Sequence, residues 1–273
     1  MRIALINSGI GLLSAAAELH RMRPAADLIL ATDPDGMPWG PRTPAGIAER
    51  ALLCARAAAA LQPDVLVMAC NTGSVHALEA LRAEFEPDLP VIGTVPAIKP
   101  AAAAHDNVAI WATVATTASA YQRRLIAEFG GTATVTPVAC PGLADAIDAG
   151  DEAAAMIAVK EAAGQTPAGC AAVVLGCTEY ELAGDWIGQA VPGARTYGSA
   201  AAVAAQALRR ARADPQASQL RSPAPGHAEA AARAEAACPA GTLQVLLSGR
   251  PADLPPAALR YPEGRLLATM PTR

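Results

Sequence analysis

Two apolar stretches of this chain each end in a cysteine. Residues 65–69 are apolar and lead into Cys70, and residues 172–176 lead into Cys177 in the same way. A buried parallel strand has this pattern, and it delivers the polar groups that follow it to the carboxyl edge of an α/β sheet. We therefore expect Cys70 and Cys177 to lie at two such edges and to face each other across one active site.

The order of the other segments predicts doubly wound parallel sheets. Strand patterns alternate with helical stretches, among them a helix expected at residues 75–85 after the Cys70 strand, and this alternation is typical of an α/β fold. A first strand and a later strand that ends in cysteine occur at residues 3 and 70, and again at 108 and 177, with offsets of 105 and 107 residues. Near-equal offsets predict two similar α/β halves. Within the second half, Pro137 predicts that the strand at 133–139 lies at a sheet edge or ends early.

The predicted domains follow from this repeat. We expect a first α/β domain formed by residues 1–97 together with about 205–273, and a second formed by residues 98–204. Residues 212–228 are rich in Pro and Ser and are expected to form a linker. The tail beyond it holds an alanine-rich, helix-like run and a strand pattern at 243–247, and we expect it to pack back on one half.

Composition and charge limit the partners of the chain. Hydrophobic residues make up 52% of it and charged residues 17%, which is typical of a folded globular protein. With a formal net charge of -4 and no basic run, it lacks the electrostatic signature of nucleic-acid or anionic-membrane binding. No segment is long and apolar enough to span a bilayer, and the N-terminus enters a strand pattern directly, so we expect a cytoplasmic protein.

The six cysteines are expected to be thiols. None of them forms a C-x-x-C pair, and the four histidines do not lie at zinc-ligand spacing, so no metal site is predicted. For any single cysteine, the simpler interpretation is a small buried hydrophobe, and Cys54 within its alanine- and leucine-rich helix fits it well.

Two facing thiols suit one particular reaction. A thiolate can remove a proton from an sp³ carbon while the opposite thiol supplies a proton to the other face, which inverts the carbon without a cofactor. The Cα–H of an amino acid is very weakly acidic, so the site must stabilise a carbanion-like transition state and exclude water. Short hydroxyl and amide donors lie just past the predicted strand ends: Ser8, Asn71, Thr72, Thr113, Thr116, Thr117 and Thr178.

Several segments, in order along residues 3–205, resemble the glutamate racemases within the Asp/Glu/hydantoin racemase superfamily. As a set they are highly specific, although no single one is. They are residues 7–12 (NSGIGL), 37–40 (MPWG), 69–72 (ACNT), 93–101 (GTVPAIKPA), 112–116 (ATVAT) with Ser119 and Tyr121, 140–143 (CPGL) and 175–178 (LGCT).

The resemblance implies two pseudo-symmetric α/β domains with the active site in the cleft between them. It implies a small acidic amino acid as substrate, no pyridoxal phosphate or metal, a homodimer, and a supply of D-glutamate for peptidoglycan. Cys70 and Cys177 would be the two acid/base residues. The pocket lining would be Ser8, Pro38, Trp39, Gly40, Asn71, Thr72, Thr113, Thr116, Thr117 and Thr178.

Two departures from the family pattern affect the groups that assist the thiols. The family usually carries Asp where this chain has Asn7, and His where it has Glu179; Trp39 in place of Tyr is a lesser change. An amide cannot take a proton, whereas a carboxylate can act as a base. We therefore expect an unequal pair, in which Glu179 assists Cys177 and Cys70 lacks its usual carboxylate. A simpler interpretation is that Glu179 only favours the N-terminus of the following helix.

Three functions remain open on the sequence alone. The segments at 37–40 and 93–101 favour a glutamate racemase. Glu179 resembles the aspartate-racemase branch and favours a racemase of aspartate or another acidic amino acid. A degenerate member that binds an acidic ligand with little turnover is the third, supported by Asn7 and opposed by the presence of both cysteines.

Overall fold

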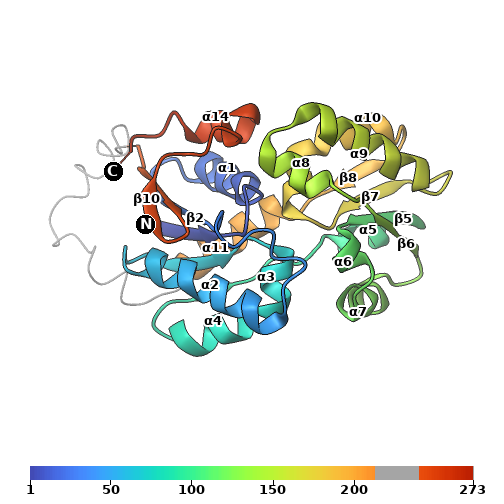
Figure 1. The fold of residues 1–273 in the computed structure, drawn as a ribbon. Helices are drawn as coiled ribbons and strands as arrows, with labels where there is room; N and C mark the ends of the chain where they lie inside the picture. Colours follow the sequence, from blue (N-terminus) through green and yellow to red (C-terminus); the bar gives the residue numbers. More distant parts are fainter. Residues whose placement is uncertain (213–239, 273) are drawn as a thin grey trace, which may run out of the picture.

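The computed structural model describes residues 1–212 and 240–272, which form two α/β halves side by side (Figure 1). The first half contains a sheet with the strand order β10-β9-β2-β1-β3-β4, and the second a sheet with the order β6-β5-β7-β8. The orders β2-β1-β3-β4 and β6-β5-β7-β8 are the same topology used twice. The predicted α/β class and the repeat behind it are therefore confirmed.

The first sheet is parallel except for its last strand, β10, which pairs antiparallel with β9. In the central strand, Ile3 lies between Leu28 and Val65 of its neighbours. The strands of this sheet are β1 (Arg2–Ile6), β2 (Asp27–Thr32), β3 (Val65–Met68), β4 (Val91–Ile92), β9 (Leu243–Leu247) and β10 (Arg250–Ala252).

The second sheet is parallel throughout. Its strands are β5 (Asn107–Ala112), β6 (Thr134–Ala139), β7 (Ala172–Leu175) and β8 (Arg195–Tyr197). β6, which contains Pro137, lies at the edge, one of the two alternatives expected, and a residue without a backbone N–H is tolerated there.

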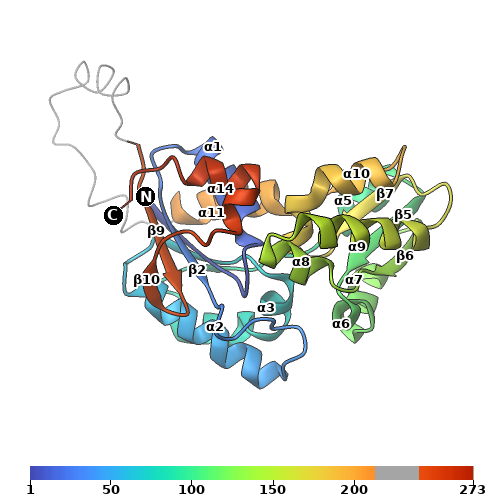
Figure 2. The same ribbon diagram turned by 45° about the horizontal axis from the view of Figure 1, so that its top comes forward.

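Helices cover both faces of each sheet, as Figures 1 and 2 show. Those of the first half are α1 (Leu12–Met22), α2 (Pro44–Ala59), α3 (Asn71–His76), α4 (Leu78–Phe85), α11 (Ala200–Arg212) and α14 (Pro262–Leu267), with the 3₁₀ helix η3 (Ala258–Arg260). Those of the second half are α5 (Ile98–Ala104), α6 (Val114–Thr117), α7 (Ala120–Phe129), α8 (Leu143–Ala149), α9 (Glu152–Gln165), α10 (Gly184–Ala190) and the 3₁₀ helix η1 (Thr178–Ala183).

The alternation of side chains along the strands builds separate cores. Ile3 and Leu5 of β1 face the side covered by α1 and α11, whereas Ala4 and Ile6 face α2 and α4. Cys54 of α2 is fully buried in the second of these cores, as its sequence context predicted.

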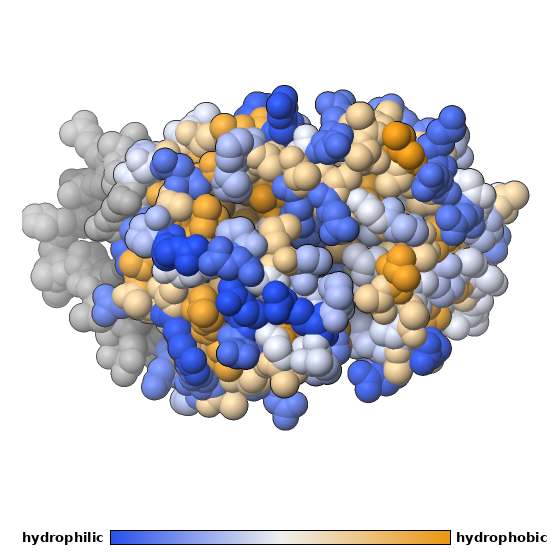
Figure 3. All heavy atoms as spheres, viewed as in Figure 1, coloured by the Kyte–Doolittle hydropathy of each residue, from blue (hydrophilic) through white to orange (hydrophobic). Residues whose placement is uncertain are grey.

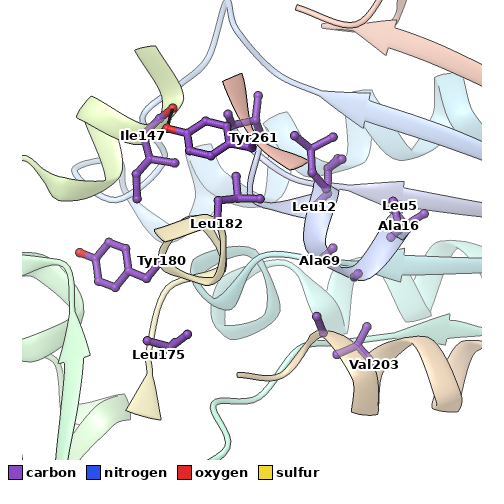
Figure 4. Packing of buried hydrophobic residues seen from close by; sticks show 14 of the residues in the cluster. Leu5, Leu12, Ala16, Ala69, Ile147, Leu175, Tyr180, Leu182, Val203 and Tyr261 are labelled. Carbon is purple, nitrogen blue, oxygen red and sulfur yellow. Dashed lines mark hydrogen bonds between the residues drawn. The ribbon is translucent and has the colours of Figure 1, made fainter. Parts of the chain in front are cut away.

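The first core continues across the boundary between the halves. Figure 4 shows Leu12 of the first half near Leu182 of η1, together with Tyr261 and Ile147. The Tyr261 hydroxyl donates a hydrogen bond to the carbonyl oxygen of Ile147 over 3.0 Å. Because Tyr261 belongs to the tail and Ile147 to α8, the tail helps to fix the second half against the first.

The tail also extends the first sheet, since β9 pairs in parallel with β2. The tail thus packs on the first half through β9 and contacts the second through Tyr261, whereas the sequence led us to expect packing on one half. α11 packs on α1 and β3, so the chain has already returned to the first half by residue 200. Of the predicted linker at 212–228, all but Arg212 lies outside the described residues, as does the alanine-rich run before 240.

One local prediction is wrong. The helix expected from residue 75 to 85 is two helices, α3 and α4, and the first begins at Asn71, directly after Cys70. The Cys70 sulfur accepts a hydrogen bond from the backbone N–H of Gly73 at 3.4 Å and so caps α3. Polar residues that resemble a loop in the sequence therefore form the first turn of a helix.

The surface in Figure 3 mixes polar and apolar side chains over both halves. Among the described residues, no helix combines the length and the apolar character that crossing a bilayer requires.

Candidate active site

Both cysteines line one cavity of about 390 Å³ between the two halves. Cys70 follows β3 in the first half, and Cys177 follows β7 in the second. Since β3 and β7 hold the same place in their sheets, the repeat itself brings the two thiols to one cleft. Ten residues expected at the site line this cavity: Ser8, Pro38, Trp39, Gly40, Cys70, Asn71, Thr72, Thr113, Thr116 and Cys177, with Glu179 as an eleventh.

Backbone and hydroxyl groups surround the Cys70 thiol. Burial raises the pKa of Cys70 to about 12, and the Glu179 carboxylate adds to the rise, while hydrogen bonds from the Gly73 and Ser8 N–H groups and the Ser8 hydroxyl oppose it. These donors stabilise a thiolate, so they are the groups that would help Cys70 to lose its proton.

The Cys177 thiol has a carboxylate partner. Its Sγ donates a hydrogen bond to Oε2 of Glu179 over 2.8 Å. Burial raises the pKa of Cys177 well above its ordinary value, and the Glu179 carboxylate raises it further. The resting geometry is thus a protonated thiol against a carboxylate that can accept its proton.

Asn7 is fully buried at the end of β1 and reaches across to the second half. Its Nδ2 donates to Thr178 Oγ1 at 3.2 Å and to Glu179 Oε1 at 3.3 Å. Its Oδ1 accepts from the backbone N–H of Ser8 at 2.7 Å. Asn7 therefore contacts Glu179, the carboxylate that accepts from the Cys177 thiol, and does not line the cavity.

Asp148 of α8 is a carboxyl group at the cavity that was not expected from the sequence. Its Oδ1 accepts a hydrogen bond from the N–H of Ile10 at 2.8 Å. Burial raises the pKa of Asp148 to about 8, and the nearby Glu179 carboxylate contributes. Helical spacing after residues 140–143 could have pointed to Asp148 in the sequence. Ala144, Asp145 and Asp148 share one face of α8, and all three line the cavity.

Glycines allow the loop after β1 to approach these carboxyl groups. A Cβ at Gly11 would lie 2.6 Å from Glu179 Oε1 and from Thr178 Oγ1, and a Cβ at Gly9 would overlap the Asp148 carboxylate. The loop at residues 7–11 can therefore contact η1 and α8 closely only because it lacks these side chains.

The Trp39 wall of the cavity is held by the buried carboxylate of Asp33. Trp39 Nε1 donates to Asp33 at 2.9 Å, Arg50 Nε donates at 2.8 Å, and the hydroxyl of Ser248 donates at 3.0 Å. Burial acts to raise the pKa of Asp33, but these hydrogen bonds outweigh it and lower the pKa below its ordinary value. Ser248 follows β9, so the tail supports this wall.

The remaining expected residues lie near the cavity without lining it. Thr117 directs its hydroxyl to the carbonyl oxygen of Ala112 at 3.5 Å, and Thr178 donates to Glu179 Oε2 at 3.3 Å. Thr113, which does line the cavity, caps α6 by accepting from the N–H of Thr116.

Two further features lie next to the cavity. Asn71 Nδ2 donates to the Gly176 carbonyl oxygen at 2.6 Å, which links the two cysteine-bearing strand ends. A second cavity of about 390 Å³ shares Gly40, Asn71, Thr72 and Thr116 with the first and continues toward α7. Within residues 1–212 and 240–272, no three His, Cys, Asp or Glu side chains are grouped so that they could hold a metal ion.

The family of the chain follows from comparison with known proteins. The model of the Asp/Glu/Hydantoin racemase family matches residues 7–207. The chain belongs to this racemase family. Its similarity to the glutamate racemases, expected from the motifs, is confirmed, and as a member of the family it is an isomerase.

Curated relatives of this racemase family are about one third identical to the chain. Glutamate racemase of Pseudomonas putida (strain W619) is 36% identical over 183 residues, which cover 65% of this chain and 69% of the relative. Glutamate racemase of Herpetosiphon aurantiacus is 34% identical over 213 residues, which cover 76% and 83%.

Solved structures of the same racemase family share the fold. Escherichia coli glutamate racemase in complex with L-glutamate and the activator UDP-MurNAc-Ala superposes with a TM-score of 0.76 at 27% identity, covering 95% of this chain and 91% of that one. Glutamate racemase from Aquifex pyrophilus gives a TM-score of 0.60 at 29% identity, covering 77% and 83%.

Proposed function

We propose that this protein is a glutamate racemase that interconverts L- and D-glutamate by two-thiol proton transfer at Cα. The observation that supports it most strongly is that Cys70 and Cys177, from different halves, line one cavity. The similarity to relatives named glutamate racemase supports glutamate as the substrate, since the Escherichia coli enzyme is described in complex with L-glutamate.

The proposed reaction moves one proton at each face of the substrate. One thiolate takes the Cα proton and becomes a thiol, and the electron pair left on carbon is delocalised into the α-carboxylate. The opposite thiol then gives its proton to the other face of Cα and becomes a thiolate. The reaction therefore needs no cofactor to balance it.

Preorganised donors account for the stabilisation of charge. Asn71, Thr72, Thr113 and Thr116 present amide and hydroxyl groups to the cavity and can hold the two carboxylates of glutamate. When Cys177 is the base that removes the Cα proton, it must first lose its own. Glu179 receives that thiol proton, because Sγ already donates to Oε2. When Cys70 is the base, hydrogen bonds from Ser8 and Gly73 stabilise its thiolate.

The biological setting is part of the same proposal. D-glutamate formed in this way would supply peptidoglycan synthesis in the cytoplasm, and the active form would be a homodimer. Gel filtration with light scattering tests the dimer independently of the chemistry.

The direct test is to incubate the purified protein with L-glutamate or D-glutamate and to follow the optical activity. The proposal predicts approach to a racemic mixture from both enantiomers, and replacement of either Cys70 or Cys177 by alanine should abolish it. Retention of full racemisation in either alanine variant would reject the two-thiol mechanism.

A second candidate is a racemase of aspartate or another acidic amino acid. The observation in its favour is Glu179 itself, which stands where glutamate racemases usually carry His. Running the same assay with L- and D-aspartate separates the two candidates, and activity with neither amino acid would favour a degenerate binding protein.

A further inference from the structure

We infer that Asn7 is a positioning residue that acts through Glu179, and that the amide at position 7 and the carboxylate at position 179 form one functional pair across the two halves. This deepens the proposed function, on which its catalytic part rests. It differs from the expectation at the sequence level, which placed the effect of Asn7 at Cys70.

The two oxygens of Glu179 have separate partners. Oε1 accepts from Asn7 Nδ2 at 3.3 Å, and Oε2 accepts from Cys177 Sγ at 2.8 Å. Asn7 therefore holds the oxygen that faces away from the thiol and fixes the rotation of the carboxylate. A side chain held at one end by a hydrogen bond directs its other oxygen with less loss of conformational freedom.

Asn7 is itself rigidly placed. It is fully buried, its Oδ1 accepts from the Ser8 N–H at 2.7 Å, and its Nδ2 also donates to Thr178 Oγ1. The Ser8 N–H bond identifies the oxygen of the amide, so the nitrogen must be the atom that faces Glu179. Donor and acceptor thus match on both sides of the contact.

An aspartate at position 7 would reverse this match. It could still accept from the Ser8 N–H, but it would place a second carboxylate within about hydrogen-bond distance of Glu179, and two such groups compete for one proton. Asp148 would be a third carboxyl group in the same cluster. The two departures from the family pattern, at positions 7 and 179, are therefore chemically dependent on each other.

The test is a cycle of the variants Asn7→Asp, Glu179→Gln and the double variant, each measured for thermal stability and for Cα–H exchange from each glutamate enantiomer in D₂O. Single Cys70→Ala and Cys177→Ala variants assign each exchange direction to its thiol. The double variant exchanges amide and carboxylate, so it keeps a donor and an acceptor at the contact but moves the charge away from Cys177.

We expect Asn7→Asp to slow abstraction of the Cα proton by Cys177 about tenfold more than abstraction by Cys70. Its loss of melting temperature should grow as the pH rises, because the shared proton is then released and the two carboxylates repel each other. The double variant should regain the melting temperature of the wild type but not the Cys177 exchange rate. A merely structural role of Asn7 would instead lower the stability of Asn7→Asp without slowing proton exchange by Cys177 more than exchange by Cys70.

Equal slowing of both directions in Asn7→Asp, or a double variant no more stable than Asn7→Asp, would overturn the inference. If Asn7→Asp does not fold, a folded double variant supports the pair, and failure of both to fold contradicts it. Absence of exchange in the wild type would instead reject the proposed function, and the stability cycle would still test the contact.

Discussion

The Cys177 thiol lies 2.8 Å from the Glu179 carboxylate, whereas Cys70 is surrounded by N–H and hydroxyl donors. The two thiols of one cavity therefore differ in how they can lose a proton. Cys177 can pass its proton to a neighbouring base, and Cys70 can only be stabilised as a thiolate once the proton has left. A racemase with this asymmetry should respond differently to changes on its two sides.

Replacement of Glu179 by glutamine should expose the asymmetry. Glutamine retains a hydrogen-bond acceptor for the thiol but cannot take its proton. We expect proton abstraction by Cys177 to slow about 100-fold and abstraction by Cys70 to change much less. The measurement is the initial rate of Cα–H loss from each enantiomer in D₂O. Equal losses in both directions, or none, would refute the assignment of Glu179 to Cys177.

Asp148 should make stability dependent on pH. The folded protein holds the Asp148 proton up to a pKa of about 8, whereas the ordinary value is 3.8. The folded state therefore binds more protons between these values, and this group reduces stability as the pH rises through them. Asp148→Asn keeps an acceptor for the Ile10 N–H and removes the ionisation.

The variant should consequently gain melting temperature relative to the wild type between about pH 4 and 8, with a constant difference above that range. Thermal unfolding followed by circular dichroism from pH 5 to 9 measures it. A difference that does not depend on pH would show that Asp148 ionises normally in the folded protein.

Gly11 should be required for the approach of Glu179. Its backbone is in the right-handed helical region, so alanine is not excluded by φ, but the added Cβ would lie 2.6 Å from Glu179 Oε1. We expect Gly11→Ala to cost about 1–3 kcal/mol of stability and to slow the Cys177 direction selectively.

Gly164→Ala in α9 is the matched control, because a Cβ there meets open space. It should leave both exchange rates unchanged and raise stability by up to about 1 kcal/mol. Similar effects of the two substitutions would mean that contact with Glu179 is not the reason for glycine at position 11.

Asp33 should stabilise the Trp39 wall through its ionised form. Because its pKa is lowered in the folded protein, this stabilisation is present above the ordinary value of 3.8 and is lost as the pH falls through the folded value. Asp33→Asn should lower the melting temperature at neutral pH and raise the KM for the amino acid. Asp35→Asn, at an exposed pair with Arg250, should change neither. A higher KM in both variants would contradict the role given to Asp33.

The sequence predicts the fold well where one physical rule acts alone. Apolar runs before Cys70 and Cys177 predicted the strands, and Pro137 predicted an edge position or an early end for β6, which lies at the edge. The start of α3 was missed because Asn71 to Ser74 are poor helix formers, and a sulfur cap from Cys70 compensates for them.

The site was harder to predict where contacts cross between the halves. Cys70 and Cys177 could be assigned to one cavity from the repeat alone. The partner of Asn7 could not be predicted, because Glu179 is 172 residues away in the sequence. Only the packing of the loop at 7–11 on η1 brings the two residues together. Asp148 and the tail residue Ser248 were missed for the same reason, since single polar residues in helices and turns carry no pattern.

The central claim is proton exchange at Cα by two facing thiols, and one measurement tests it most directly. The purified wild-type protein is incubated in D₂O with L- or D-glutamate and, in parallel, with L- or D-aspartate, and deuterium at Cα is followed by NMR. We predict that deuterium enters glutamate from both enantiomers and appears first in the product of opposite configuration. Absence of Cα deuterium in all four amino acids would contradict the account.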